Sequence, residues 1–108
     1  MIYLASPYTH QYPEVREVRF RAACRAAAEL MRAGKMVFSP IAHSHPIAEY
    51  GLPIDWEYWE ACNRRHLQNC DEVMVLKIDG WQDSVGVQAE LKIAAELEMP
   101  ISYIDPDD

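Results

Sequence analysis

Short apolar runs alternate with helical segments along the whole chain, and this alternation constrains the fold more than any other feature. Four runs have the length and composition of buried strands, at residues 2–5, 36–38, 73–76 and 101–104. Three amphipathic helical segments lie between them, at residues 13–32, 55–69 and 84–98. The proline-rich residues 41–53 are expected to form a loop. Strands separated by helices pair in parallel with right-handed crossovers, so we predict an α/β fold with a parallel sheet of four or five strands.

The length and charge of the chain limit its organisation and its partners. A chain of 108 residues, half of them apolar, is predicted to form one domain over residues 1–108. A domain of this size buries only a modest fraction of its surface, so we expect a homo-oligomer. The net charge of −7 is opposite in sign to that of proteins that bind nucleic acids or membrane surfaces. We therefore expect neither as a partner.

The cysteine count and the absence of long apolar segments predict a cytoplasmic protein. The three cysteines are odd in number, and no signal peptide precedes the first strand. No segment approaches the roughly 18 apolar residues that a membrane span needs. These features favour a reduced protein with free thiols.

The predicted topology places a ligand site at one edge of the sheet. Ligands of parallel α/β sheets bind beyond the carboxyl ends of the strands, where the strand order reverses. Three segments lie at those ends: residues 3–8, 39–45 and 77–84. Functional side chains are therefore sought there, and Ser6, directly after the first strand, is a candidate ligand contact.

Glu90 lies within the apolar face of the last predicted helix. At 100° per residue, its neighbours on that face are Gly86, Val87, Ile93, Ala94 and Leu97. A carboxylate among apolar side chains is costly unless it is paired or protonated. Glu90 is therefore either a ligand-binding acid or a partly exposed acid that is stabilised by the helix dipole or by a backbone group.

The residues that open this helix add a possible anion site. Ser84 and Gly86 follow a strand and a turn, so free backbone N–H groups and the Ser84 hydroxyl together can bind an anion. Ser84 can equally act as a simple N-cap, which is the commoner role of serine at such a position. Gly86 would let a ligand or another backbone approach closely.

Two motifs of the chain match a known superfamily. They are Ile2-Tyr3-Leu4-Ala5-Ser6-Pro7 and Ser84-Val85-Gly86-Val87-Gln88-Ala89-Glu90, the latter followed by Ala94 and Pro100. Over residues 1 to about 104 the chain resembles the nucleoside 2-deoxyribosyltransferase superfamily, which includes the 2′-deoxynucleoside 5′-phosphate N-hydrolases. The resemblance implies a flavodoxin-like three-layer sandwich that binds a nucleoside or nucleotide as a small-molecule partner.

The resemblance also implies roles for individual residues. Glu90 would be the nucleophile, Tyr3 would hold it by a hydrogen bond that keeps it ionised, and Ser84 would contact a phosphate or sugar. Serine at position 84 resembles the nucleotide hydrolases more than the transferases. A carboxylate nucleophile can trap the sugar covalently as the N-glycosidic bond breaks, and water or a second base then resolves the intermediate. We expect no cofactor and no metal.

One position departs from the pattern of the active enzymes. They usually carry an aspartate eight residues before the acid that precedes the third strand, and counting back from Asp71 gives Asn63. An amide cannot donate the proton that the departing base needs, and Glu60, one turn earlier, is the possible substitute. The alternative functions are a non-catalytic nucleotide-binding or sensing module and an oligomeric structural protein.

Two histidines and three tryptophans are further candidates. His43 and His45 point the same way if their segment is extended, and would then line the pocket or hold a metal with a third ligand. Trp81 is the candidate for stacking on a base, whereas Trp56 and Trp59 are predicted to pack in the core or between subunits.

Arg19 and the cysteines favour structural roles. Arg19 lies on the apolar face of the first helix, where pairing with an internal acid is favoured over contact with a ligand phosphate. Cys62, His66 and Cys70 are four residues apart and share a helical stripe, but the Cys-x-x-Cys spacing of zinc sites is missing. We therefore predict buried cysteines that face the sheet.

Overall fold

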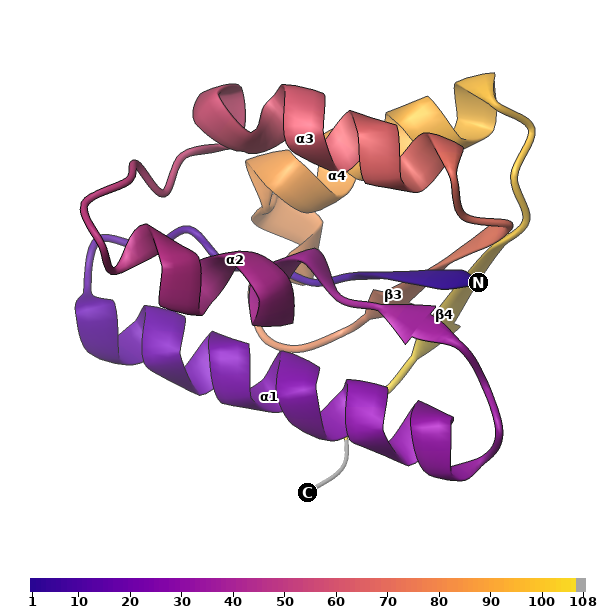
Figure 1. The fold of residues 1–108 in the computed structure, drawn as a ribbon, viewed down its shortest axis with the longest axis horizontal. Coiled ribbons are helices and arrows are strands. Elements are labelled where there is room, and N and C mark those ends of the chain that lie inside the picture. Colours follow the sequence, from indigo (N-terminus) through magenta and orange to yellow (C-terminus); the bar gives the residue numbers. More distant parts are fainter. Residues whose placement is uncertain (107–108) are drawn as a thin grey trace.

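A four-stranded, all-parallel sheet forms the middle layer of the protein (Figure 1). The structure is a computed structural model, and it describes residues 1–106 of the chain. The strands are β1 (Ile2–Ala5), β2 (Val37–Phe38), β3 (Glu72–Leu76) and β4 (Ile101–Ile104). They pair in the order β2-β1-β3-β4, and every pairing is parallel. The predicted parallel sheet is confirmed, with four strands.

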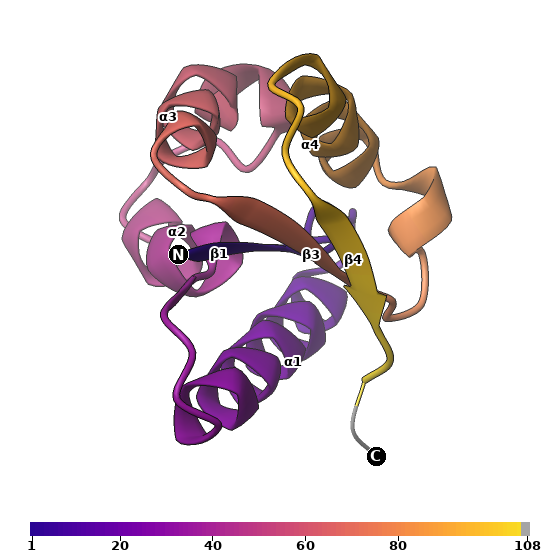
Figure 2. The ribbon, with the colours of Figure 1, turned by 90° about the vertical axis from the view of Figure 1, so that its right-hand side faces the viewer.

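Helices cover both faces of the sheet and complete a flavodoxin-like three-layer fold. The helices are α1 (Pro13–Arg32), α2 (Pro40–Ala48), α3 (Trp56–Gln68) and α4 (Val85–Glu96), with a 3₁₀ turn η1 (Trp81–Asp83). Helix α1 lies on one face and packs against α2, whereas α3 and α4 lie side by side on the other face (Figure 2). None of the helices within residues 1–106 is both long enough and apolar enough to span a membrane.

Each face of the sheet has its own hydrophobic core, because successive side chains of a strand point to opposite faces. Tyr3 and Ala5 of β1 pack in the cluster under α3 and α4, and Leu4 packs in the cluster over α1. The alternation places the phenol of Tyr3 on the α4 side of the sheet.

The predicted loop at residues 41–53 is wrong in its first half, which forms α2. Ser39 caps this helix, since its Oγ accepts a hydrogen bond from the N–H of Ala42 at 3.1 Å. Pro40 occupies the first turn, where a missing N–H costs nothing. Two prolines in nine residues suggested a loop, but one starts the helix and the other, Pro46, lies two residues before its end.

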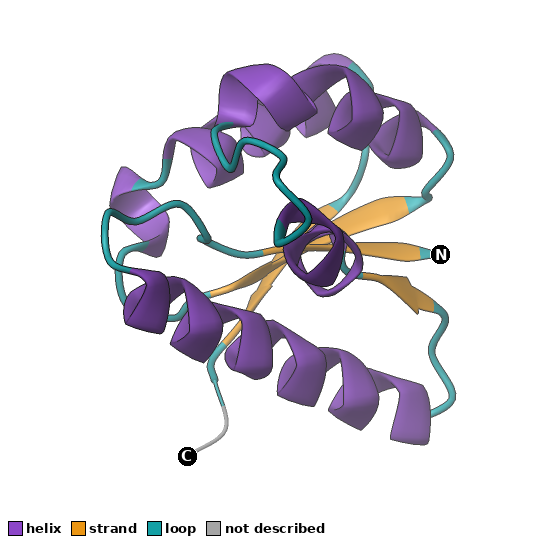
Figure 3. Ribbon diagram, turned by 60° about the vertical axis from the view of Figure 1, so that its left-hand side comes forward, coloured by secondary structure: helices purple, strands orange, loops and turns teal. Residues whose placement is uncertain are grey.

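The three predicted helices are confirmed to within two residues at each end. Asp55 and Ser84 cap α3 and α4 through side-chain oxygens that accept from the N–H of Tyr58 and Val87. The predicted apolar face of α1 is wrong at Val18, whose side chain is 64% exposed. The loops that follow β1, α2 and β3 gather at the carboxyl ends of the strands (Figure 3).

Candidate functional site

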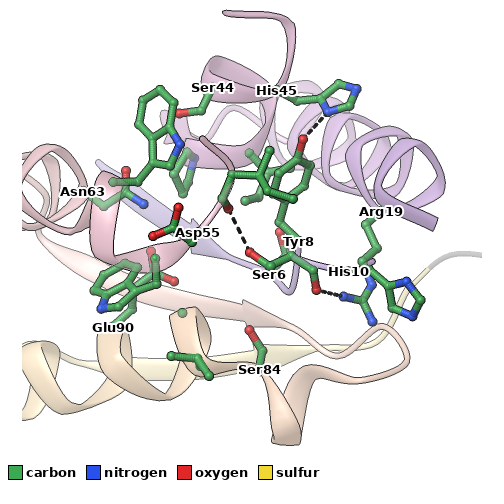
Figure 4. Close-up of a pocket in the computed structure, with 18 of the residues that line it drawn as sticks. Ser6, Tyr8, His10, Arg19, Ser44, His45, Asp55, Asn63, Ser84 and Glu90 are labelled. Atoms are coloured by element: carbon green, nitrogen blue, oxygen red, sulfur yellow. Dashed lines mark hydrogen bonds between the residues drawn. The ribbon is translucent and has the colours of Figure 1, made fainter. Parts of the chain in front are cut away.

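A pocket of about 620 Å³ opens at the carboxyl ends of the strands (Figure 4). The chain leaves β1 toward β2 on one side of the sheet and leaves β3 toward β4 on the other, so the strand order reverses between β1 and β3. This is the position that the parallel topology predicts for a ligand. The walls come from the segment after β1, the helices α1 and α2, the start of α3 and the residues that open α4.

Glu90 of α4 lines this pocket and is only 4% exposed. The Tyr3 hydroxyl, which is fully buried beneath the pocket, donates a hydrogen bond to Glu90 Oε2. The two residues are 87 positions apart in the sequence, and parallel pairing of β1 with β3 brings them together. The contact that the resemblance implies is therefore present.

Burial controls the protonation of Glu90. It raises the pKa of this carboxyl from the ordinary 4.5 to about 8, and the opposing effect of the Tyr3 hydrogen bond is smaller. The prediction that Tyr3 keeps Glu90 ionised is wrong for the ligand-free protein, because desolvation outweighs one hydrogen bond. Burial, followed by the nearby Glu90, raises the pKa of Tyr3 well above its ordinary value. Both raised pKa values favour the protonated form, so the Tyr3 phenol and most of the Glu90 carboxyl keep their protons at neutral pH.

The N-terminus of α4 forms the wall next to Glu90. Ser84 Oγ accepts from the N–H of Val87 at 3.2 Å, so Ser84 is an N-cap, and its own O–H proton remains available to a ligand. Val85 and Gly86 also line the pocket, and their N–H groups lie in the first turn, which has no intrahelical acceptors. A Cβ on Gly86 would meet Trp56 at an ordinary 3.6 Å, so no close backbone approach requires this glycine.

Ser6 contributes a second hydroxyl to the pocket. Its side chain is only 4% exposed, and its Oγ has no hydrogen-bond partner among residues 1–106. A buried hydroxyl without a partner is rare in folded proteins and costs free energy. Ser6 is therefore a polar group that a ligand in the pocket can satisfy.

Asn63 lines the pocket and is buried, but the proposed substitute Glu60 does not line it. Glu60 is paired with Arg64 at 3.1 Å on the same helix, so the suggested replacement of the missing acid is wrong. Asp55 is a pocket acid that the sequence did not single out. Its position at the start of the predicted helix 55–69 was its only signal, and that signal also describes an ordinary N-cap.

The prediction that Trp81 lines the pocket is wrong, whereas the predicted core packing of Trp56 is confirmed together with a place in the pocket lining. Trp56 and Trp59 line the pocket, whereas Trp81 lies outside the lining and packs beside Tyr103, with ring centroids 5.6 Å apart. Trp59 is fixed by its Nε1–H, which donates to the carbonyl of Pro53 at 2.8 Å. Position in the turn before α4 favoured Trp81, but that turn directs the ring toward β4.

The two histidines point to different surroundings, because they lie on a helix and not on an extended segment. His43 is exposed and lies beside the rings of Phe38 and His66, outside the pocket lining. His45 lines the pocket, and its Nδ1 lies 2.6 Å from Tyr8 Oη. The prediction of a pocket role is therefore wrong for His43.

Arg19 of α1 reaches the mouth of the pocket on the side opposite Glu90 (Figure 4). Its guanidinium donates to the carbonyls of Thr9 at 3.0 Å and Asp79 at 3.4 Å. Within residues 1–106 no carboxylate lies within 4.0 Å of it, so the predicted internal ion pair is wrong. Gly80 has a φ of +91°, and a Cβ there would lie 2.6 Å from Arg19 Nη2.

The cysteines are free and half-buried, and Cys70 packs against the core under α3 and α4. His66 stacks on Phe38 with a centroid distance of 4.1 Å. Within residues 1–106 the stripe of Cys62, His66 and Cys70 does not converge on a common point as metal ligands do. The structural interpretation of this stripe agrees with these contacts.

The fold and the site define an α/β domain with a mainly apolar pocket at the switch point of a parallel sheet and a buried carboxylic acid in its wall. Residues 1–105 match the family described as "Domain of unknown function (DUF1937)", and the chain belongs to this family. No curated protein matches the chain. The family description names no activity, so function has to be argued from the site.

Proposed function

We propose that this protein binds a nucleoside or nucleotide and cleaves or transfers at its N-glycosidic bond, with Glu90 as the nucleophile. The observation that carries the proposal is the contact between Tyr3 and a buried Glu90 in the wall of a 620 Å³ pocket. Pockets of this volume hold small molecules of nucleotide size. A carboxyl that is kept buried at a cost in stability, and beside a cavity, is typical of a functional group.

The distribution of side chains supports a substrate with three different parts. A sugar would lie against Glu90, with its hydroxyls or phosphate near Ser84 and the free N–H groups of α4. The rings of Trp56 and Trp59 offer flat apolar surfaces to a base. Arg19 supplies a positive charge at the opposite side of the pocket.

The chemistry requires one proton to leave Glu90 and one to reach the base. After Glu90 loses its proton, its carboxylate attacks the anomeric carbon, the C–N bond breaks, and a glycosyl ester forms. Water or a second base then attacks that carbon and releases Glu90. Asn63 cannot protonate the departing base. Three further acids line the pocket, Asp55, Glu57 and Asp83, and we assign to Asp55 the transfer to the base of the proton that Glu90 releases.

A non-catalytic nucleotide-binding or sensing module is the second candidate. Two observations favour it: an amide at position 63 and a pKa of about 8 for Glu90, which leaves little nucleophile at neutral pH. Both features preserve the pocket while lowering its reactivity. This candidate predicts the same ligands without turnover.

The test measures release of free base by chromatography from a panel of nucleosides and their 5′-monophosphates. We expect turnover that increases with pH up to about 8, as Glu90 ionises. Glu90→Gln should lower the rate by at least about 10³-fold, because it removes the nucleophile. Glu96→Gln, on the exposed face of the same helix, is the matched control and should leave the rate unchanged.

Asn63→Asp tests the missing acid directly. A positioned general acid contributes about 10²-fold or more, so this variant should release base faster than the natural protein. Ligand-induced thermal stabilisation without base release in either form would favour the sensing module. An absence of both turnover and stabilisation across the panel would contradict both candidates.

A further inference from the structure

Three possible metal ligands converge where α1 meets α2, at the edge of the pocket wall. His45 Nε2 lies 2.7 Å from Glu17 Oε2 and 3.3 Å from Glu49 Oε1. The donor atoms of all three side chains lie within 4.8 Å of one another. Glu17 belongs to α1, whereas His45 and Glu49 are one turn apart at the end of α2. Two helices therefore bring one imidazole and two carboxylates to one point.

The surroundings of His45 fix its ring in a ligand-like orientation. Phe20 stacks on the imidazole with a centroid distance of 4.4 Å, and Tyr8 Oη lies 2.6 Å from Nδ1 (Figure 4). Without an ion, Nε2–H donates to Glu17 and Nδ1 accepts from the Tyr8 hydroxyl. When an ion takes the lone pair of Nε2, the ring proton would move to Nδ1 and donate to Tyr8 Oη. Metal-binding histidines are typically held in this way by an oxygen on the second ring nitrogen.

The carboxylates are placed to accept an ion from solvent. The side chains of Glu17 and Glu49 are 42% and 64% exposed, so both can adjust without disturbing the core. Bonds of about 2.0–2.2 Å to a tetrahedral ion separate its donors by roughly 3.3–3.5 Å. The distance from His45 to Glu49 already fits this spacing, and that to Glu17 must widen by less than 1 Å.

We propose that Glu17, His45 and Glu49 bind a divalent first-row transition ion, with Zn²⁺ the leading candidate. An imidazole ligand favours such ions over Mg²⁺ and Ca²⁺, which prefer oxygen donors throughout. Neutral His45 and two carboxylates carry a charge of −2, which the ion neutralises. This proposal departs from the expectation of no metal, and its ligands beside His45 are Glu17 and Glu49, without His43. The proposal is independent of the reaction assigned to Glu90.

The ion would also tie together two helices that line the pocket. Arg19 on α1 and Ser44 on α2 both line it, and each lies within two residues of a proposed ligand. Binding to the folded state alone would raise the melting temperature as the free ion concentration increases.

The experiment titrates the intact chain with Co²⁺, followed by its visible absorption, and with Zn²⁺, followed by calorimetry. We expect one ion per chain and a higher melting temperature. Glu17→Gln and Glu49→Gln should each weaken binding at least tenfold, and Tyr8→Phe about 10–100-fold, as for other ligand-orienting groups. Glu14→Gln, an exposed acid one turn before Glu17, is the matched control and should not change the affinity.

The thiols need a separate control. A double variant, Cys62→Ser with Cys70→Ser, should bind Co²⁺ as the natural protein does, and the spectrum should lack thiolate charge-transfer bands. The proposal is overturned if no ion binds near neutral pH, if binding survives both glutamine variants, or if it disappears with the cysteines. In those cases the cluster is a polar contact between two helices, in which His45 is hydrogen-bonded to Glu17. Because Glu49 is largely exposed, its variant tests the site without a risk to folding.

Discussion

Glu90, which lines the pocket, and Glu17, which lies outside the lining and contacts the pocket residue His45, have pKa values that move in opposite directions. Burial raises the pKa of Glu90 to about 8, although Tyr3 donates a hydrogen bond to it. The His45 hydrogen bond lowers the pKa of Glu17, a side chain that remains accessible to water. Each acid has a polar partner, so the partner alone does not decide its charge. The comparison teaches that loss of water determines which of these acids keeps its proton.

The same difference separates what the two regions can do. A buried acid that exchanges a proton near neutral pH suits a reaction in which charge develops on a substrate. Two accessible carboxylates beside an imidazole suit a cation that brings its own charge. The fold thus places a buried acid in the pocket wall and a pair of accessible acids behind His45, outside the pocket lining.

Glu90→Gln should give the largest change in stability. The folded state keeps the Glu90 proton up to pH about 8, whereas the unfolded chain releases it near 4.5. The contribution of Glu90 is therefore fully present below pH 4.5 and is lost as the pH rises toward 8. At about 1.4 kcal/mol per pH unit, the stability advantage of Glu90→Gln over the natural protein should grow by about 3 kcal/mol between pH 4.5 and 7.

Urea denaturation of both proteins at the two pH values measures this difference. Glu96→Gln is the control, since Glu96 is exposed on the opposite face of α4. An equal difference between the two proteins at both pH values would show that Glu90 is not desolvated in solution.

Tyr3→Phe should have a smaller effect with two signatures. The buried carboxyl loses its donor, at a cost of about 1–3 kcal/mol in unfolding free energy. The pKa of Glu90 should then rise further, because the hydrogen bond from Tyr3 is the influence that lowers it. The pH at which base release or ligand binding reaches half its maximum would therefore move upward. Tyr103→Phe, at a half-exposed tyrosine of β4, is the control and should change neither the unfolding free energy nor this pH. If the pH of half-maximal activity or binding stays the same in Tyr3→Phe, the assignment of that titration to Glu90 is contradicted.

Glu17→Gln should give the smallest effect, and its pH dependence should have the opposite sign. A lowered pKa in the folded state means that the contribution of Glu17 is present above the ordinary 4.5 and is lost as the pH falls through its folded value. Melting temperatures in a metal-free buffer with chelator should therefore differ slightly at neutral pH and converge in acid. Added salt should reduce the difference, since the Glu17 side chain is exposed to solvent. If the two melting temperatures moved apart in acid, the pKa of Glu17 would be raised as that of Glu90 is, and the contrast between the two acids would be lost.

Local patterns predicted the sheet and three of the helices, because strand length, N-caps and helical periodicity depend only on residues that are close together in the sequence. Helical periodicity also predicted that Glu90 points toward the interior, and Glu90 is buried together with Val87 and Ala94 on the same face of α4. The tight contact with Tyr3 could be expected only through the resemblance, because it depends on the packing of α4 over β1.

The remaining site residues depend on tertiary contacts that no local pattern records. The partners of His45 include Tyr8 and Glu17, which are 37 and 28 residues away. Because α2 is rich in proline, its sequence predicted a loop. On the helix that forms instead, the side chains of His43 and His45 point in different directions. Arg19 was assigned an internal acid because its position on an apolar face required some partner, and the two backbone carbonyls that satisfy it are provided by loops.

The contact between Arg19 and Gly80 has a consequence for how this family can vary. A Cβ at position 80 would displace the mobile end of the Arg19 side chain, and the left-handed backbone would strain any other residue there, whatever stands at position 19. Displacement of the guanidinium would release the carbonyls of Thr9 and Asp79, which Arg19 joins at the pocket entrance. Related sequences should therefore keep glycine at position 80 wherever they keep this turn. A substitution there should loosen both loops that Arg19 connects.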